Sequence, residues 1–375
     1  MRYYNVLNNK KQPRIAMAVT NDLVTDRRVL RHAATLREAG CSVQLIGRAD
    51  LGVRAKNTWR FYAEYNLRLF FRLLRTPCDI VWANDTDTLP AAWLAARLRR
   101  KRLVMDSHEI FPEVPELVGR DGVKRVWQLI ERCLMPRCDA NLTVCQSVAD
   151  QYKCTLGIDM VVVRNMSSLT PGPSPAGEGG GCRIHCTPLS HGRGAGGEAL
   201  LLYQGAVNLG RGIDWAIDAL GRLVRCRLVV AGVGDLYDQM RAYAASKPWA
   251  DRIEFLGRLE PDALAALTPQ ADVGLVMLQD LGLNYRCALP NRVGDFIAAG
   301  VPMVVSDMPE MRRVIDAYAI GAVLAAPGPD ALADAVEHVL ARPKADYDFA
   351  AARADFDWNR EKKKLFDIVK SVASY

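Results

Sequence analysis

The sequence lacks several features that would assign it to a familiar class of protein. It has no run of about eighteen apolar residues, so no membrane-spanning helix is predicted. Its first residues, MRYYNVLNNKKQPR, contain no apolar core region, and we expect no secretion signal. No G-x-G-x-x-G motif follows the first apolar run, RIAMAVT, which disfavours a dehydrogenase.

The cysteines show no pairing pattern. None of the ten forms a C-x-x-C pair, and several lie in apolar runs, where a free thiol behaves as a small hydrophobic group. We therefore expect reduced thiols and a cytoplasmic location. Cys182 and Cys186 lie near His185 and His191, but their spacing and their glycine- and proline-rich surroundings disfavour a metal site.

Positive charge is concentrated in the first half of the chain, which as a whole carries a net charge of +7. Residues 97–102 read RLRRKR, and residues 59–75 mix aromatic residues, leucines and arginines at helical spacing. Such a stretch is either a core helix with a solvated basic face or a surface that meets anionic lipid headgroups or an acidic substrate. No nucleic-acid-binding motif is present, so no nucleic-acid partner is expected.

The chain of 375 residues is long enough for two domains. Apolar, strand-like runs alternate with helical patterns in both halves, which predicts two α/β domains, each with a doubly wound parallel sheet. The first helix is expected over DRRVLRHAATLREAG, with Val29, Leu30, Ala33 and Leu36 on its apolar face. We expect a first domain over residues 1–166, a Gly/Pro-rich linker or insertion over 167–198 and a second domain over 199–345. A C-terminal helix over 346–375 is expected to pack back toward the first domain.

Ligands of open α/β sheets bind beyond the carboxyl ends of the strands, so the residues after each strand are candidates. The stretch YQGAVNLGRGIDWAI places Gly205, Gly210 and Gly212 beside Arg211, at a strand-to-helix turn that suits phosphate. A shorter turn, AGVGD, contains Gly232 and Gly234. Tight turns without a ligand explain the same glycines, and both interpretations stay open.

A third stretch, LPNRVGDFIAAGVP, opens another helix. Asn291 is a candidate N-cap, and Asp295 lies about one turn further on. A carboxylate there can accept two ribose hydroxyls while the first helical amides face phosphate. The alternative is an acid that only complements the helix dipole.

Taken in order, these stretches resemble glycosyltransferase family 4, the glycosyl transferases group 1, of the GT-B type. TNDLVTDRRVLRHAATLREAG, WANDTDTLPAAWLAARL, LVMDSHEIFPE and RIEFLGRL agree with the family as well, so the resemblance spans about residues 14–365 apart from the linker. It implies two Rossmann-like domains facing across a cleft, a nucleotide-sugar donor and transfer with retention of configuration. It implies neither a cofactor nor a divalent ion.

The resemblance also implies roles for individual residues. The carboxylate that binds the nucleotide ribose falls on Asp295, and the phosphate ligands fall on Arg211 and on Ala206, where Arg292 can compensate. The upstream glutamate of the family's E-x7-E pattern is Cys287 here. The donor site thus comprises Gly205, Arg211, Gly232, Gly234, Asn291, Arg292 and Asp295.

In the first half, the resemblance assigns the stretch DSHEIFPEVPEL to the reaction. His108 would contact the transferred sugar or the acceptor, and Asp106 and Glu109 would orient it. A purely structural polar loop is the alternative. Metal ligation is disfavoured, because His-Glu alone supplies only two ligands. Polar residues after two other strands are candidates for acceptor hydroxyls or for helix caps: Asn21, Asp22, Asn84 and Asp85.

We therefore expect a glycosyltransferase that acts on a glycan or lipid-linked acceptor, with peripheral contact with an anionic membrane. Two alternatives stay open. A sugar-nucleotide epimerase would convert the donor without an acceptor, and a non-catalytic sugar-nucleotide or glycan binder would bind without turnover.

Overall fold

The computed structural model describes residues 12–21, 23, 26–55, 58–114, 117, 119–166 and 198–373. The chain forms two compact units. Unit 1 comprises residues 1–165, 282–288 and 359–375, and unit 2 comprises residues 166–281 and 289–358. Three sequence predictions lie outside the described residues: the linker at 167–197, the Cys182–Cys186 stretch and Asp22.

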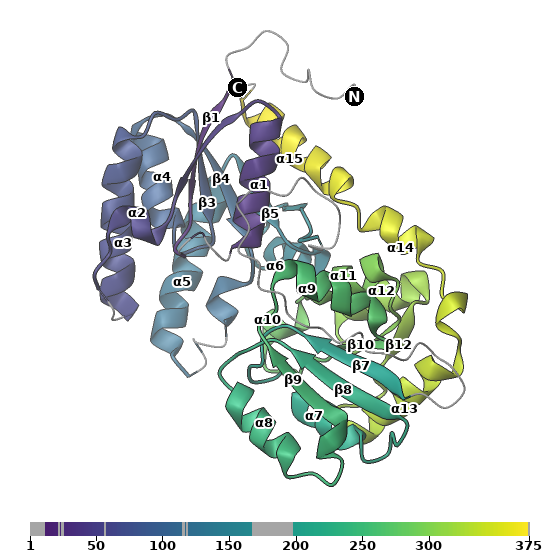
Figure 1. The fold of residues 1–375 in the computed structure, drawn as a ribbon. Coiled ribbons are helices and arrows are strands. Elements are labelled where there is room, and N and C mark those ends of the chain that lie inside the picture. Colours follow the sequence, from purple (N-terminus) through teal and green to yellow (C-terminus); the bar gives the residue numbers. More distant parts are fainter. Residues whose placement is uncertain are drawn as a thin grey trace. The chain divides into compact units, whose positions relative to one another are not determined.

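Unit 1 is built on a parallel sheet of six strands (Figure 1). Its strands follow the spatial order β2-β1-β3-β4-β5-β6, so the direction of winding reverses between β1 and β3. This is the topological switch point at which open α/β sheets bind ligands. The strands are β1 (Arg14–Ala18), β2 (Ser42–Ile46), β3 (Ile80–Asn84), β4 (Arg102–Ser107), β5 (Ala140–Thr143) and β6 (Val161–Val162).

Helices flank this sheet. Most connect consecutive strands, and two come from distant parts of the sequence. The helices are α1 (Arg27–Glu38), α2 (Arg48–Leu51), α3 (Thr58–Arg75), α4 (Leu89–Leu98), α5 (Asp121–Leu134), α6 (Gln146–Leu156), α10 (Leu283–Arg286) and α15 (Trp358–Ala373), with short 3-10 turns at η1 (Phe111–Glu113) and η3 (Met135–Arg137).

Helix α1 shows how the local sequence determines an element and how its buried face differs from the prediction. Asp26 caps the helix, because its carboxylate accepts a hydrogen bond from the Val29 amide at 3.0 Å. The predicted apolar face was wrong at Leu30, whose side chain is 38% exposed. Arg28 and His32 lie on the buried face instead, because both contact a buried carboxylate of the sheet.

Unit 2 repeats the architecture. Its six parallel strands follow the order β12-β11-β10-β7-β8-β9, with the switch point between β7 and β10. The strands are β7 (Ala199–Gln204), β8 (Cys226–Ala231), β9 (Ile253–Gly257), β10 (Val273–Val276), β11 (Met303–Val305) and β12 (Gly321–Val323). The helices are α7 (Ile213–Ala219), α8 (Tyr237–Ala245), α9 (Pro261–Leu267), α11 (Asn291–Ala299), α12 (Pro309–Tyr318), α13 (Pro329–Ala341) and α14 (Ala350–Asp355), with 3-10 turns at η4 (Ala250–Arg252), η5 (Thr268–Gln270) and η6 (Lys344–Asp346).

The central strands of both sheets are buried. Trp82 in β3 and Tyr203 in β7 have no exposed surface, and their neighbouring strand residues are nearly all buried. Strands buried on both faces read as continuous apolar runs, which is why the sequence predicts them well. The predicted fold class, two Rossmann-like α/β domains, is confirmed.

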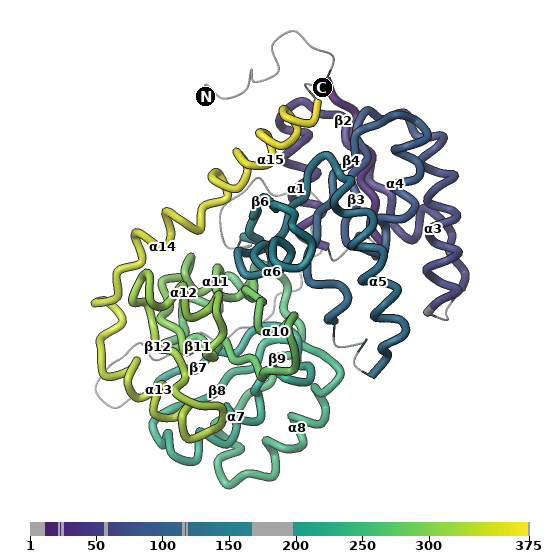
Figure 2. The backbone as a smooth tube through the Cα atoms, turned by 180° about the vertical axis from the view of Figure 1, so that it is seen from behind, coloured from purple at the N-terminus to yellow at the C-terminus, as the bar shows by residue number. Residues whose placement is uncertain are grey.

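Unit 1 includes a helix from the far end of the sequence. Figure 2 shows α15 lying beside α1. Glu361 on α15 is fully buried and accepts hydrogen bonds from the backbone amide of Arg164 at 3.0 Å and from its guanidinium at 3.2 Å. Lys362 on the same helix pairs with Glu38 at the end of α1. These contacts place α15 in the same compact unit as the first sheet.

No helix within the described ranges is both long and apolar enough to cross a membrane.

Candidate functional site

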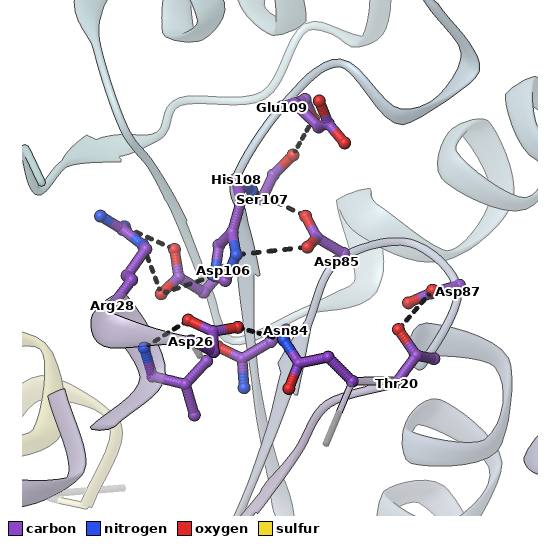
Figure 3. Close-up of polar contacts among 12 residues, drawn as sticks. Thr20, Asp26, Arg28, Asn84, Asp85, Asp87, Asp106, Ser107, His108 and Glu109 are labelled. Carbon is purple, nitrogen blue, oxygen red and sulfur yellow. Dashed lines mark hydrogen bonds and ion pairs between the residues drawn. The ribbon is translucent and has the colours of Figure 1, made fainter. Parts of the chain in front are cut away.

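Polar residues gather at the switch point of unit 1, beyond the ends of β1, β3 and β4 (Figure 3). The Thr20 hydroxyl donates to Asp87 at 2.7 Å, which joins the segment after β1 to the turn after β3. Asp85, in that turn, has a φ of 61°, a left-handed conformation that costs energy for a residue other than glycine. Strain of this kind clusters at functional sites, so the turn is a strong candidate.

His108 is held between two carboxylates. Its backbone amide donates to Asp85 at 2.8 Å, and its Nδ1 lies 3.2 Å from the other Asp85 oxygen. Its Nε2 lies 3.8 Å from Asp106, too far for a direct hydrogen bond. Burial opposes the charged imidazolium, but Asp85 and Asp106 outweigh it and raise the pKa of His108 to about 9. His108 is therefore a cation at neutral pH.

The Asp106 side chain is completely buried, and neighbouring cations and hydrogen-bond donors compensate its negative charge. Arg28 contacts both of its oxygens, at 2.7 and 3.3 Å, and His32 Nδ1 lies 3.1 Å away. Burial alone would raise the pKa of Asp106, yet Arg28 and the two histidines hold it well below its usual range. Asp106 thus provides a fixed negative charge behind His108.

His32 has the opposite protonation state from His108. Burial and the neighbouring Arg28 charge lower the pKa of His32 to about 4, although it contacts Asp106. It is neutral at pH 7. The cluster therefore distinguishes two histidines by environment: His108 is charged at pH 7 and His32 is neutral.

Glu109 is anchored within unit 1. Its carboxylate accepts a hydrogen bond from the Asn284 side-chain amide at 2.8 Å, and the Asn284 carbonyl oxygen accepts one from the Ile110 amide at 3.2 Å. These bonds join α10 to the turn after β4. Glu109 therefore shapes that turn.

The predicted acceptor residues differ in their surroundings. Asn21 bonds to Asp26 at 2.6 Å and to the Leu23 amide at 3.0 Å, which is typical of a turn at a helix start. Asn84 is fully buried and donates to the Ala18 carbonyl at 2.8 Å. Of the described candidates, only Asp85 bonds directly to His108.

In unit 2, the predicted glycines allow two turns to approach closely. A Cβ on Gly232 would lie 1.8 Å from the Gly205 carbonyl oxygen, and one on Gly234 would lie 2.2 Å from the Asn208 side chain. The Asp235 amide donates to Asn208 at 3.0 Å. Tight packing between the turns after β7 and β8 therefore accounts for both glycines of AGVGD.

The first turn of α11 lies over the carboxyl ends of β7 and β10, at the switch point of unit 2. Arg292 is buried and donates to the carbonyls of Gln204 at 3.1 Å and Met277 at 3.3 Å. Its guanidinium carbon lies 4.6 Å from the centroid of the Tyr203 ring. Arg211, half-buried, lies in the glycine turn just before α7.

Asp295 is held by a residue that sequence reasoning missed. Gln204, the last residue of β7, donates to the Asp295 carboxylate at 2.9 Å and accepts from Thr268 at 3.0 Å. The prediction that Asn291 caps α11 was wrong. Pro290 occupies the N-cap position, and Asn291 is the exposed first residue of the helix.

Other residues missed from the sequence are polar groups on buried helix faces: Arg28, His32, Glu131 and Tyr152. Arg28 and His32 carried a usable signal, because they are four residues apart and share the face of Val29 and Leu36. Within the part of the chain that the structure describes, no three His, Cys, Asp or Glu side chains form a group that could hold a metal ion.

Comparison with known proteins identifies the family and the fold. Residues 25–166 match the family described as Glycosyltransferase Family 4, and residues 198–342 match Glycosyl transferases group 1. A curated relative is the phosphatidyl-myo-inositol mannosyltransferase of Mycobacterium leprae, 28% identical over 180 residues. That match covers 44% of this chain and only 44% of the mannosyltransferase.

Solved structures share the fold over nearly the whole chain. The sucrose-phosphate synthase of Thermosynechococcus elongatus has a TM-score of 0.75 at 14% identity, covering 97% of this chain and 100% of that chain. Anabaena HepE in complex with UDP has a TM-score of 0.67 at 12% identity, covering 96% and 100%.

Two Rossmann-like sheets with these relatives define a glycosyltransferase fold of the GT-B type. The chain belongs to glycosyltransferase family 4, the group 1 glycosyl transferases. The resemblance inferred from the motifs is thereby confirmed.

Proposed function

We propose that this protein transfers a sugar from a nucleotide-sugar donor to a glycan or lipid-linked acceptor, with retention of configuration. The observation that carries the proposal is the cluster of charged side chains at the switch point of unit 2. Asp295 and Arg292 both contact Gln204 at the end of β7, and the curated relative is a glycosyltransferase by name.

Unit 2 is the proposed donor site. Asp295 would accept the ribose hydroxyls, with Gln204 fixing its carboxylate. Arg211, Arg292 and the first amides of α11 would face the diphosphate, because helix N-termini and guanidinium groups favour phosphate. Stabilising the charge that develops on the leaving diphosphate is the main electrostatic task of such a reaction. We nominate no enzymic nucleophile and no divalent ion.

Unit 1 is the proposed site for the transferred sugar or the acceptor. The protonated His108 would face the transferred sugar or the acceptor, while Asp85 and Asp106 keep the imidazolium charged and oriented. Holding the reacting groups in place is a large part of what the protein must supply.

A thermal-shift panel of UDP-, GDP-, ADP- and CMP-sugars tests the donor site. A donor at one hundred times its Kd should add about 2.7 kcal/mol of stability, which corresponds to a shift of several degrees. Asp295→Ala and Arg211→Ala should abolish the shift. The exposed residues Asp316 and Arg241 supply matched controls, and Asp316→Ala and Arg241→Ala should retain it.

Product analysis with the best donor then tests the reaction. Transfer to a glycan or lipid-linked acceptor is expected, with the anomeric configuration of the donor preserved. A new sugar nucleotide formed from the donor alone would favour an epimerase, and binding without any product would favour a binding protein. Either result would reject the proposed transfer.

We further propose that unit 1 contacts an anionic membrane through the surface of α3 and α4, which pack together. Helix α3 exposes Leu67 and Phe71, and α4 exposes Arg97 and Leu98, with the exposed Arg100 directly after its end. Apolar and basic groups side by side suit a lipid headgroup region.

Vesicle co-sedimentation tests this surface. Arg97→Glu/Arg100→Glu should weaken binding to vesicles that contain anionic lipid, and the matched pair Arg225→Glu/Arg241→Glu in unit 2 should not. Arg99 is unsuitable for this test, because it donates to the carbonyls of Leu73 and Thr76. Equal binding by both pairs would contradict the membrane proposal.

A further inference from the structure

A buried polar cluster adjoins the Asp85–His108 pair without belonging to the proposed chemistry. Its centre is Glu131 on α5, which is 4% exposed. One carboxylate oxygen of Glu131 accepts hydrogen bonds from the Thr86 hydroxyl at 2.7 Å and from the Tyr152 hydroxyl at 2.8 Å. A carboxylate buried this deeply persists only when it is well bonded.

The cluster reaches both members of the pair through their neighbours in the chain. Thr86 directly follows Asp85, in the turn with the left-handed residue. The Tyr152 hydroxyl lies 3.3 Å from that of Ser107, which directly precedes His108. Ser107 in turn donates to the Glu109 carbonyl at 2.8 Å and so closes the turn after β4.

We propose that Glu131 is a positioning residue that holds the turn after β3 and the end of β4 so that Asp85 and His108 stay paired. This inference rests on the proposed function in one respect: the proposed function supplies the sugar that the Asp85–His108 pair would bind. Thr86 and Tyr152 are almost completely buried, so no water can replace the shared acceptor if Glu131 is removed. The strained turn at Asp85 would then relax.

The charge on Glu131 is not what the role requires. Burial raises the pKa of Glu131 to about 7, against the hydrogen bonds from Thr86 and Tyr152, and Asp85 and Glu113 add to the rise. Glutamine has the same length and keeps a carbonyl oxygen as acceptor. Glu131→Gln should therefore preserve the arrangement, whereas Glu131→Leu should not.

The pKa of His108, measured by NMR titration of its imidazole, reports the pairing directly. The chain has five histidines, and His108→Asn assigns the signal. We expect the raised pKa to persist in Glu131→Gln. In Glu131→Leu it should fall toward the ordinary value of about 6.5. Gln128→Leu, on the exposed side of α5, is the matched control and should leave the pKa unchanged.

Activity provides the second readout. In Glu131→Leu, kcat should fall, by up to about a hundredfold for a misplacement near 1 Å. The KM for the donor should change less than kcat, because the ribose and the diphosphate of the donor are assigned to unit 2. Tyr152→Phe removes one of the two hydrogen bonds to Glu131 and keeps the shape of the side chain. If Glu131→Leu does not fold, the His108 pKa and kcat are measured in Tyr152→Phe instead.

An unchanged His108 pKa and kcat in folded Glu131→Leu or Tyr152→Phe would overturn the proposal, even if the melting temperature fell. A wild-type protein without transferase activity would refute the proposed function instead. The titration would then still decide whether Glu131 positions His108.

Discussion

Arg28 carries most of the charge compensation around Asp106. Two of its nitrogens donate to the carboxylate oxygens, and the third donates to the Val163 carbonyl. His32 is neutral at pH 7, so it adds a hydrogen-bonding contact but no charge. Breaking a buried ion pair by removing one partner leaves an uncompensated charge, which is far more costly than losing a surface pair.

Arg28→Met should therefore lower the free energy of unfolding by about 3–5 kcal/mol at pH 7. Urea unfolding measures it. Arg27→Met, on the exposed side of α1, should change the free energy by less than about 0.5 kcal/mol. A loss below 1 kcal/mol in Arg28→Met would show that Asp106 is not held by this pair.

At this scale the sequence predicts the position of a site better than its contacts. Asp85 and His108 were candidates because they directly follow β3 and β4, and Asp106 because it lies near the carboxyl end of β4. Glu131 and Gln204 were not, because their partners are 45 and 91 residues away in the chain and no local pattern indicates them.

At the scale of elements, the turns after β7 and β8 in unit 2 depend on glycine for space. The Gly205 carbonyl oxygen occupies the position that a side chain on Gly232 would need. The opposing atom is backbone, so no flexible side chain can move aside. The two turns must separate if Gly232 is replaced.

Gly232→Ala should lower the free energy of unfolding by about 1–3 kcal/mol, which is the usual cost of overpacking. This loss comes in addition to the cost of a positive φ for alanine. Gly328→Ala is the control, because Gly328 also has a positive φ but no atom lies near its Cβ position. If thermal unfolding shows the same loss of unfolding free energy in both variants, the positive φ alone explains the effect. If Gly232→Ala loses more, the contact between the two turns explains the difference.

The alternation of apolar runs was sufficient to predict the strands, since buried parallel strands are apolar throughout. It could not predict that α10 belongs to unit 1. That helix has four residues, and it is held by Asn284 and by the thiol of Cys145, which donates to the Cys287 carbonyl at 3.0 Å.

On the scale of the whole molecule, buried titratable groups couple stability to pH. Burial and the nearby Asp85 charge raise the pKa of Asp87 to about 8, and the two carboxylates beside His108 raise its pKa to about 9 despite burial. Their ordinary values are about 3.9 and 6.5. In both cases the folded state binds more protons, so stability falls as the pH rises through each window.

Between pH 7 and 8 both groups contribute, each by about 1.4 kcal/mol per pH unit at most. Between pH 8 and 9 His108 contributes together with buried thiols such as Cys138 and Cys226, because burial raises their pKa values to about 12 and about 11. The free energy of unfolding should thus fall from pH 7 to 9. Asp87→Asn should about halve the slope between pH 7 and 8. A wild-type protein equally stable at pH 7 and 9 would contradict these protonation states.

Unit 1 is assembled from both ends of the chain, and this affects how the protein is made. The Glu361 carboxylate that bonds Arg164 is synthesised almost two hundred residues after it. At ordinary translation rates this interval is about 10–40 s. During that time the nascent first domain lacks α15 and exposes the face that the helix will cover. Synthesis of α15, rather than completion of the first sheet, is therefore the step that finishes unit 1. A chaperone that binds apolar surfaces would meet this face before α15 does.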